Sequence, residues 1–371
     1  MAPADVHITI DARMSEVSGI GTYIQAVVPR VIARWTDARF TLLGSADMLQ
    51  RVFASNPRVT HRQLETPVLS LLEQFALLRA IPRDTSLLWS PHLNIPYFYR
   101  GALAVTVHDV FHLSPFNASR AKRVYATVMF RRIVQHARVV FCNSDFTAAQ
   151  LTTCVGSPRV LRTTKLGADP HWFEVGGVAC TDPPYFLAIG NIKPHKNLRR
   201  LIEAFQRVAD EIPHRLLLVG QRAGLRTIDD EVQTLAPGLA SRIEFTGYVT
   251  QATLERYISG CDALIHPSLY EGFGLPPVEA LASGKPVAVS RVTALPEVCG
   301  PMADYFDPHD VESIAAALRK RARASVGSSE EQASRRQWAR QFDWDRCAAE
   351  THLHLLAATD DHRRGRQSPS R

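Results

Sequence analysis

The sequence predicts an α/β protein built from two doubly wound domains that face each other across a cleft. The chain has 371 residues, a length that suits two domains better than one. Short apolar, β-branched segments alternate with longer amphipathic segments, and this rhythm restarts near the middle of the chain. Near-continuous apolar strands followed by helices are typical of parallel sheets covered by helices on both faces.

The expected elements form two series separated by a linker. The first has strands at residues 6–10, 40–43, 87–89, 102–107 and 139–142 and helices at 22–34, 119–136 and 146–153. The second has strands at residues 185–189, 215–219, 243–245, 263–266 and 286–289 and helices at 198–211, 252–259 and 311–323. Residues 167–184, with paired glycines and paired prolines, are typical of a linker. We therefore expect domains over residues 1–170 and 171–343, with a disordered basic tail over 360–371.

The composition indicates a globular protein without a membrane-spanning segment or a metal site. Apolar residues make up 46% and charged residues 21% of the chain, the balance of a globular protein. No apolar run reaches the roughly 18 residues that a membrane span needs, and the N-terminus lacks a secretory apolar region, so we expect a cytoplasmic protein. The six cysteines form no C-x-x-C pair and the histidines no H-E-x-x-H motif, so we expect neither a metal site nor a cofactor.

The formal charge of +7 raises the question of an anionic partner. The chain lacks aromatic stacking platforms and a helix-turn-helix pattern, so we expect no nucleic acid. The expected helix at residues 119–136 interleaves cations with apolar residues, as helices on anionic membrane surfaces do. The alternative is that this helix packs on the sheet through its apolar face and exposes its basic face to solvent. The cations are Arg120, Lys122, Arg123, Arg131 and Arg132.

The most informative segment is PSLYEGFGLPPVEALASGKP at residues 267–286. A Gly-rich loop containing Glu271, Gly272 and Gly274 leads from a strand into a helix that carries Glu279. Glycines let backbone amides approach a ligand closely, and a helix N-terminus favours an anion. A phosphate with carboxylates on either side for hydroxyl groups suits a nucleotide sugar. The alternative is that Glu279 caps or solvates the helix and the glycines only turn the chain.

The E-x7-E spacing from Glu271 to Glu279 resembles the signature of retaining glycosyltransferases of family four, which have the GT-B fold. Six further segments match motifs of that family in order: GIGTY at 19–23, VTVHDV at 105–110, NSDFTAAQL at 143–151, LGADP at 166–170, GNIKPHKNLRRLIEAF at 190–205 and ALPEVCGPMADYFDP at 294–308. The resemblance implies that residues 1–170 form the acceptor-side domain and residues 171–343 bind the nucleotide sugar. It also implies that a last helix at 344–357 returns to the first domain.

The resemblance also implies roles for single residues of the second domain. Lys196 neutralises the donor diphosphate, Glu271 lies against the transferred sugar and Glu279 binds the ribose hydroxyls. A lysine at a helix start opposes the helix dipole, which by itself favours an anionic ligand there. The remaining donor-binding positions are Gly190, Lys193, Gly272, Phe273, Gly274 and Leu275, with Lys193 a weaker substitute for a second phosphate contact.

In the first domain, His108 is implied to lie beside the donor sugar, with Asp109 next to it. A packed core histidine is the alternative. Gly19 and Gly21 would let a loop approach the diphosphate and the acceptor, unless they only turn the chain. Arg13, just after the first strand, is a candidate contact to the acceptor or to a phosphate.

The implied reaction is metal-free, retaining transfer of a hexose from a nucleotide sugar to a glycan or lipid-linked acceptor. Similarity to bacterial enzymes of surface polysaccharide, O-antigen or exopolysaccharide synthesis favours mannose from GDP-mannose. A UDP-sugar-dependent transferase and a nucleotide-sugar epimerase of related architecture are the alternatives within enzymes, because fold alone does not set function. A non-catalytic sugar-nucleotide binder is the alternative outside them. We also expect that the basic helix at 119–136 brings the protein to the inner face of the cytoplasmic membrane.

Overall fold

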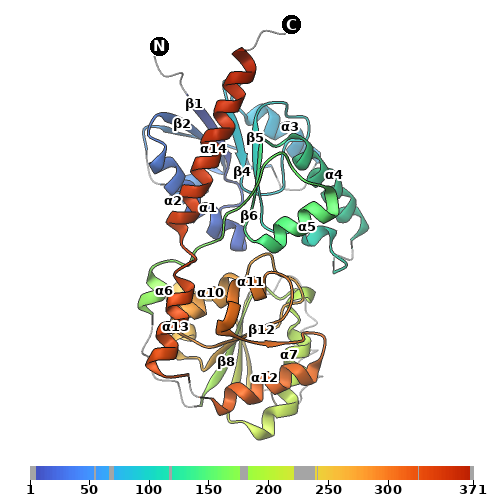
Figure 1. Ribbon diagram of the computed structural model, residues 1–371, viewed down its shortest axis with the longest axis vertical. Coiled ribbons are helices and arrows are strands. Elements are labelled where there is room, and N and C mark those ends of the chain that lie inside the picture. Colours follow the sequence, from blue (N-terminus) through green and yellow to red (C-terminus); the bar gives the residue numbers. More distant parts are fainter. Residues whose placement is uncertain are drawn as a thin grey trace. The chain divides into compact units, whose positions relative to one another are not determined.

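The computed structural model describes residues 6–53, 56–66, 71–116, 119–175, 183–220, 239, 241–324 and 326–367. The chain divides into two compact units, each with its own sheet (Figure 1). The first unit comprises Met1–Leu166 and Trp344–Arg371, and the second comprises Gly167–Asp343. The prediction of two doubly wound α/β domains is confirmed. The expected linker belongs to the second unit, and its residues 176–182 lie outside the described part of the chain.

The first unit contains a seven-stranded sheet in the order β3-β2-β1-β4-β5-β6-β7, with every pairing parallel. Strand β1 lies inside the sheet between β2 and β4 and is buried along its whole length, including its polar residues His7, Thr9 and Asp11. Strand bounds are β1 (Val6–Asp11), β2 (Ala38–Gly44), β3 (Val59–Gln63), β4 (Leu87–Ser90), β5 (Leu103–Val107), β6 (Val139–Cys142) and β7 (Leu161–Thr163).

Helices surround this sheet. Their bounds are α1 (Ser18–Arg34), α2 (Ala46–Val52), α3 (Leu71–Ala80), α4 (Arg120–His136), α5 (Asp145–Val155) and α14 (Trp344–Gln367), with a short 3-10 turn η1 (Phe111–Leu113). The last helix, α14, packs beside α1 in the first unit, as Figure 1 shows. The prediction of a disordered tail from residue 360 is wrong as far as Gln367, because α14 continues to that residue. Residues 368–371 lie outside the described part.

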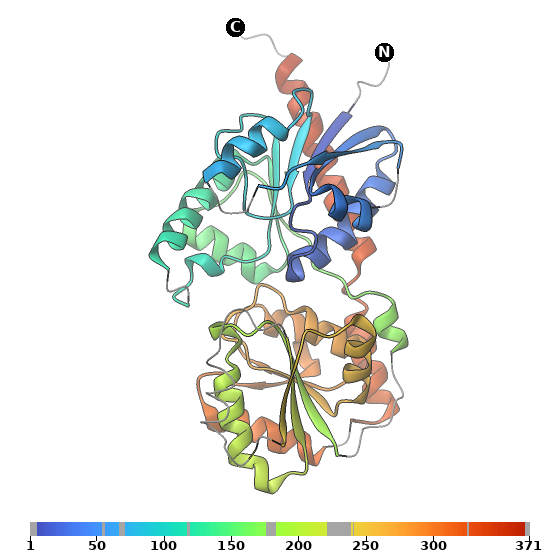
Figure 2. The same cartoon turned by 180° about the vertical axis from the view of Figure 1, so that it is seen from behind.

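The second unit contains a six-stranded parallel sheet in the order β10-β9-β8-β11-β12-β13. Its strands are β8 (Tyr185–Ile189), β9 (Arg215–Val219), β10 (Ile243–Gly247), β11 (Ala263–His266), β12 (Val287–Ser290) and β13 (Ala303–Phe306). Its helices are α6 (His171–Glu174), α7 (Leu198–Val208), α9 (Gln251–Gly260), α10 (Leu275–Ala282), α11 (Leu295–Cys299), α12 (Val311–Arg323) and α13 (Ser329–Ala339), with 3-10 turns η2 (Pro194–Lys196), η3 (Ala209–Glu211) and η4 (Gly300–Met302). Helices α7 and α12 pack together (Figure 2). Phe205 of α7 is fully buried in the core of this unit.

In both sheets the order of the strands reverses next to the first strand of the unit. In the first unit the order reverses between β1 and β4, and in the second between β8 and β11. In open parallel sheets, ligands bind at the carboxyl ends of the strands at such a switch point, because the connecting loops diverge there. The fold therefore directs attention to the residues that follow these four strands.

Candidate active site

At the switch point of the second unit, a lysine and a glutamate form a close ion pair. Lys196 Nζ lies 2.6 Å from Glu271 Oε1, and both side chains are largely buried. His266 Nε2 lies 2.8 Å from the same carboxylate oxygen. Lys196 follows β8, whereas His266 is the last residue of β11 and Glu271 lies in the loop after it. The structure thus brings together two of the three residues that the sequence predicts as catalytic, and adds His266, which the sequence analysis missed.

The backbone around Lys196 explains why its side chain reaches this position. Gly190 directly follows β8 with φ of 151°, and a Cβ there would lie 3.4 Å from Lys196 Cε, so the lysine chain passes directly over this glycine. Asn197 occupies the left-handed region at φ of 58° and is the N-cap residue of α7. Its amide nitrogen donates to the carbonyls of Pro267 and Pro308, tying the lysine turn to the loop of Glu271.

The electrostatics of the pair keep the glutamate ionised. Burial by itself raises the pKa of Glu271, but the Lys196 ammonium and His266 outweigh it and hold the pKa well below its usual range. The Glu271 amide also donates to Thr293 Oγ1 at 3.2 Å. Next to Lys196, burial and the lysine charge lower the pKa of His195 to about 4, so this imidazole is neutral at pH 7. Among the described residues, the site therefore presents a fixed cation that is paired with one carboxylate and that a ligand anion can share.

The Gly-rich loop enters α10 as expected. Gly274 precedes the helix with φ of 108°, a value that only glycine adopts readily, and prolines follow in the first turn after Leu275. Gly272 and Phe273 are buried, and the Phe273 ring packs against Phe342. The binding roles of the loop amides stay predictions.

Glu279 lies on α10, where nearly all neighbouring residues are buried. Burial and the negative charge of Asp169 raise the pKa of Glu279 to about 7. A carboxylate that is half protonated near neutral pH gains from hydroxyl groups that hydrogen-bond to its ionised form. This fits the ribose contact that the resemblance implies, which stays a prediction.

We expect the Glu279→Gln variant to be more stable than the wild type at pH 8, by on the order of 1–3 kcal/mol, and nearly equal at pH 4. The folded pKa of about 7 lies above the ordinary value of 4.5, so folded protein holds a proton that unfolded protein has lost between these values. Wild-type stability therefore falls as pH rises through this window, and glutamine removes the slope. Denaturant unfolding from pH 4 to 8 measures it, and a pH-independent difference would contradict the shift.

Two further cations, Lys193 and Arg200, lie close to Lys196 in the sequence. Lys193 is exposed and, among residues with described placement, has no ion-pair partner. Arg200, one turn into α7, donates from Nη1 to Asn197 Oδ1 at 3.0 Å and lies close in sequence to Lys196. The sequence motifs assign no role to this arginine, although its place in the first turn of the helix after the predicted phosphate-binding segment is a usable signal.

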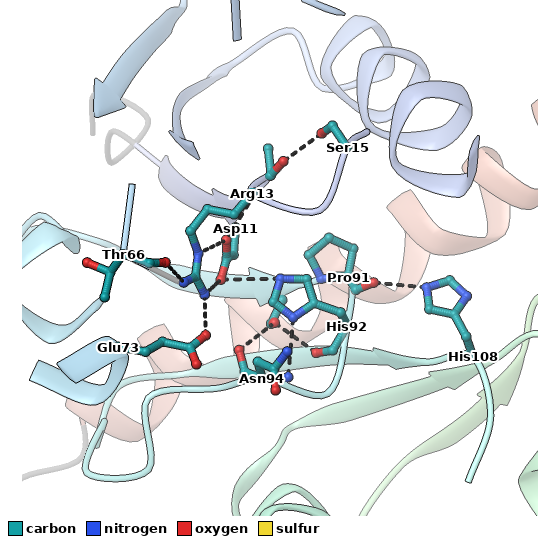
Figure 3. Close-up of polar contacts among 11 residues, drawn as sticks. Asp11, Arg13, Ser15, Thr66, Glu73, Pro91, His92, Asn94 and His108 are labelled. Atoms are coloured by element: carbon teal, nitrogen blue, oxygen red, sulfur yellow. Dashed lines mark hydrogen bonds and ion pairs between the residues drawn. The ribbon is translucent and has the colours of Figure 1, made fainter. Parts of the chain in front are cut away.

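In the first unit, the predicted role of Arg13 as a direct ligand contact is not supported. Its guanidinium makes a two-pronged contact with Asp11, through Nε at 2.8 Å and Nη2 at 2.6 Å. The same Nη2 donates to Glu73 at 2.8 Å, and the arginine side chain is only 4% exposed (Figure 3). Burial raises the pKa of Asp11, but His92 and Arg13 outweigh it and keep the carboxylate ionised. Arg13 therefore serves a buried ion network.

His108 follows β5, and its Nε2 lies 2.9 Å from the Pro91 carbonyl. A carbonyl accepts only, so Nε2 carries the proton and Nδ1 is left as an acceptor. Burial lowers the pKa of His108 to about 4, so the ring is neutral at pH 7. The neighbouring Asp109 accepts the amide of Phe111 at 2.8 Å, so its carboxylate shapes the following turn. The structure places His108 in the first unit and the Lys196–Glu271 pair in the second.

Gly19 and Gly21 do not lie in a loop, contrary to the prediction. Helix α1 begins at Ser18, before both glycines, whereas the sequence analysis expected it from residue 22. A Cβ on Gly21 would lie 2.5 Å from the Ser15 carbonyl oxygen, so this glycine lets the helix start pack on the turn after β1. Gly19 is exposed in the first turn. Any ligand contact of these residues would come from a helix N-terminus.

None of the described helices combines the length and apolar character needed to cross a bilayer. Within the same residues, no group of three or more His, Cys, Asp or Glu side chains is placed to hold a metal ion.

Comparisons with known proteins give a family match within the second unit and similar solved structures over nearly the whole chain. Residues 183–323 match the family described as glycosyl transferases group 1. O-antigen chain mannosyltransferase B of Escherichia coli is 29% identical over 276 residues, covering 70% of this chain and 71% of that protein. Sucrose-phosphate synthase from Thermosynechococcus elongatus superposes with a TM-score of 0.75 at 19% identity, over 95% of this chain and 100% of that one. Anabaena HepE in complex with UDP-glucose superposes with a TM-score of 0.72 at 18% identity, over 95% and 99% of the two chains.

The family match spans the unit that holds the Lys196–Glu271 pair, and the structural likeness extends over nearly the whole chain. The chain therefore contains, at residues 183–323, a domain that matches the glycosyl transferases group 1 family, and it shares its fold with the two solved structures on which it superposes.

Proposed function

We propose that the protein is a retaining mannosyltransferase that takes mannose from GDP-mannose and adds it to a glycan or lipid-linked acceptor in surface polysaccharide synthesis. The observation that carries the proposal is the Lys196–Glu271 pair at the switch point of a group 1 domain. The choice of mannose rests on the likeness to an O-antigen chain mannosyltransferase. The structures complexed with UDP-sugars share only the fold, so they do not favour a UDP-sugar donor for this chain.

Lys196 supplies the charge that such a reaction needs. When a nucleoside diphosphate leaves the sugar, negative charge builds on the phosphate oxygens. A preformed cation there stabilises this charge without reorganising. The donor diphosphate would share Lys196 with Glu271, which is why we propose that no divalent metal takes part.

Retention of configuration needs either a carboxylate nucleophile or attack on the face that the leaving group vacates. Glu271 is held by Lys196 and His266 and is a weak nucleophile for that reason. We therefore propose a same-face substitution in which the leaving phosphate takes the proton from the attacking hydroxyl group of the acceptor substrate. In the first unit, the Nδ1 atom of His108 is an acceptor suited to a sugar hydroxyl.

A panel of nucleotide sugars tests the proposal. Wild-type protein is incubated with GDP-mannose, GDP-fucose, UDP-glucose, UDP-galactose and UDP-N-acetylglucosamine in EDTA, and binding and slow release of nucleoside diphosphate are measured. Micromolar binding and hydrolysis of GDP-mannose, with the anomeric configuration of the released mannose resolved by NMR, support the proposal. Preference for a UDP-sugar overturns the donor, a divalent-metal requirement overturns the metal-free route, and no binding by folded protein overturns the site.

We also propose that α4 makes a peripheral contact with anionic membranes. Val124 and Val128 are 65% and 44% exposed on this helix, beside the exposed cations Arg120, Lys122, Arg123 and Arg131. Arg132 is not available for lipid, because its guanidinium donates to the carbonyls of Tyr97 and Tyr99. The inward face of the helix, including Met129 and Phe130, is buried on the sheet.

Replacing Arg120, Arg123 and Arg131 by glutamine is expected to weaken binding to phosphatidylglycerol vesicles at least about 100-fold, because each cation near the surface contributes roughly 1 kcal/mol. Co-sedimentation with vesicles measures this. The matched control removes three exposed cations of the second unit, Arg199, Lys320 and Arg323. Equal loss in both variants would mean that only net charge matters, and unchanged binding of the α4 variant would remove the proposal.

A further inference from the structure

The carboxyl ends of three neighbouring strands of the first unit are joined by one buried polar network. Asp11 ends β1, His92 follows β4, and His108 follows β5. Strand β4 pairs with both β1 and β5, so the three residues leave the same edge of the sheet. Figure 3 shows Arg13 between Asp11 and Glu73, with His92 beside Asp11 and Pro91 between His92 and His108.

The two nitrogens of His92 have different partners, and these define its tautomer. The Asn94 amide donates to Nδ1 at 3.2 Å, so Nδ1 is an acceptor and the proton resides on Nε2. That Nε2 lies 3.3 Å from Asp11 Oδ2, and the His92 and Asp11 side chains are 1% and 2% exposed. The ring thus connects the end of β1 to the loop after β4.

The loop that His92 anchors also carries the carbonyl that orients His108. The Ser90 hydroxyl donates to the carbonyl of His92 at 2.9 Å, so the loop is closed around the imidazole. Pro91, between these residues, presents its carbonyl to His108 Nε2 at 2.9 Å. A shift of this loop would remove the only acceptor that the structure gives to that ring nitrogen among the described residues.

We propose that His92, held by Asp11, is a positioning residue that fixes His108 in its Nε2-protonated tautomer through the Pro91 carbonyl. Arg13 and Glu73 support it, because Arg13 aligns the Asp11 carboxylate with two hydrogen bonds and is itself held by Glu73. Fixing the tautomer keeps Nδ1 as an acceptor for a hydroxyl of the substrate. The value of this for turnover rests on the proposed function, but the tautomer of His108 does not.

Two substitutions of His92 separate its two contacts. His92→Asn places an oxygen near the Nδ1 position and keeps the Asn94 contact while losing Asp11. His92→Gln places an amide nitrogen near the Nε2 position and keeps the Asp11 contact. His7→Gln is the matched control, because His7 is also a buried histidine of this sheet, 3% exposed, but lies at the amino end of β1.

The first readout is the tautomer of His108 in full-length protein labelled with ¹⁵N-histidine. Its resonances are identified by their absence from His108→Gln. We expect only the Nε2-protonated form in wild type, His92→Gln and His7→Gln, and a mixture of both tautomers in His92→Asn. A pure Nε2-protonated form in His92→Asn, or a mixture in His7→Gln, would overturn the proposal.

The second readout is turnover of GDP-mannose. We expect His92→Asn to lower kcat roughly five- to tenfold, because losing about one neutral hydrogen bond lowers the population of the Nε2-protonated tautomer of His108 by that order. The donor KM should change less than about twofold. His92→Gln should recover most of this loss. Equal kcat losses in His92→Asn and His7→Gln would show a merely structural role and count against the proposal. If no nucleotide sugar reacts with the wild type, the proposed function fails and the tautomer measurement alone decides the inference.

Discussion

Lys196→Ala is expected to lower kcat/KM by about 100- to 1000-fold while the protein remains folded. The ammonium is aimed at the place where the leaving diphosphate develops charge, and loss of one such fixed group typically costs this much. Lys196 is partly exposed, and Glu271 retains His266 at 2.8 Å after the change, so the fold keeps its main contacts. Steady-state kinetics with the donor found in the panel measures the effect, and circular dichroism checks the fold.

Companion variants make this result specific. Glu271→Ala removes the other half of the ion pair and is expected to reduce turnover by a similar order of magnitude. Lys196→Arg keeps the charge and should recover part of the activity. Arg199→Ala is the matched control, since it removes an exposed cation of α7 that pairs only with Glu203 among the described residues. Near-normal activity of folded Lys196→Ala would sink the assignment of this lysine.

The largest expected effect on stability comes from Arg13→Met. Asp11 and Glu73 are 2% and 0% exposed, and the change leaves both carboxylates buried without their shared cation. Removing one partner of a buried ion pair costs about 3–5 kcal/mol. Chemical denaturation of the full-length protein, followed by circular dichroism, measures the loss in the transition of the first unit.

A double variant tests the cause. Adding Glu73→Gln to Arg13→Met removes one of the stranded charges and should recover part of the lost stability, so the two effects should not add. Arg51→Met is the control, because Arg51 pairs with Glu16 on the surface of the same unit and should leave the transition unchanged. Additive effects of Arg13 and Glu73 would contradict a shared network.

The regular elements could be predicted where burial imposes a period on the sequence. Helix α12 has the predicted bounds, and α4 differs by one residue, because each buries one stripe of apolar residues. Strands β3 and β7 were missed because they lie at the edges of the sheet, where partial burial leaves no continuous apolar run. Helix α13 was missed because its surface is almost entirely polar.

The candidate site divides in a similar way. Lys196 and Glu271 were predicted separately from their motifs, since each lies at the end of a strand with glycines that only a ligand or a close contact would require. Their ion pair, and the participation of His266, depend on β8 and β11 being neighbours in the sheet. Arg13 was predicted to meet a ligand because a sequence does not show that Glu73 lies beside it.

The sequence by itself therefore determined the two doubly wound domains, the motif that carries Lys196 and Glu271 and the kinship with glycosyltransferases. These features depend on short-range patterns in the sequence, because burial and backbone geometry determine which residue types occur at each position of a strand, helix or turn. Only the tertiary structure decided that Arg13 is sequestered by two carboxylates, that Gly19 and Gly21 begin a helix, and that His92 lies between Asp11 and the loop that orients His108. Such contacts arise from strand order, which brings distant segments to one edge of a sheet and leaves no local trace in the chain.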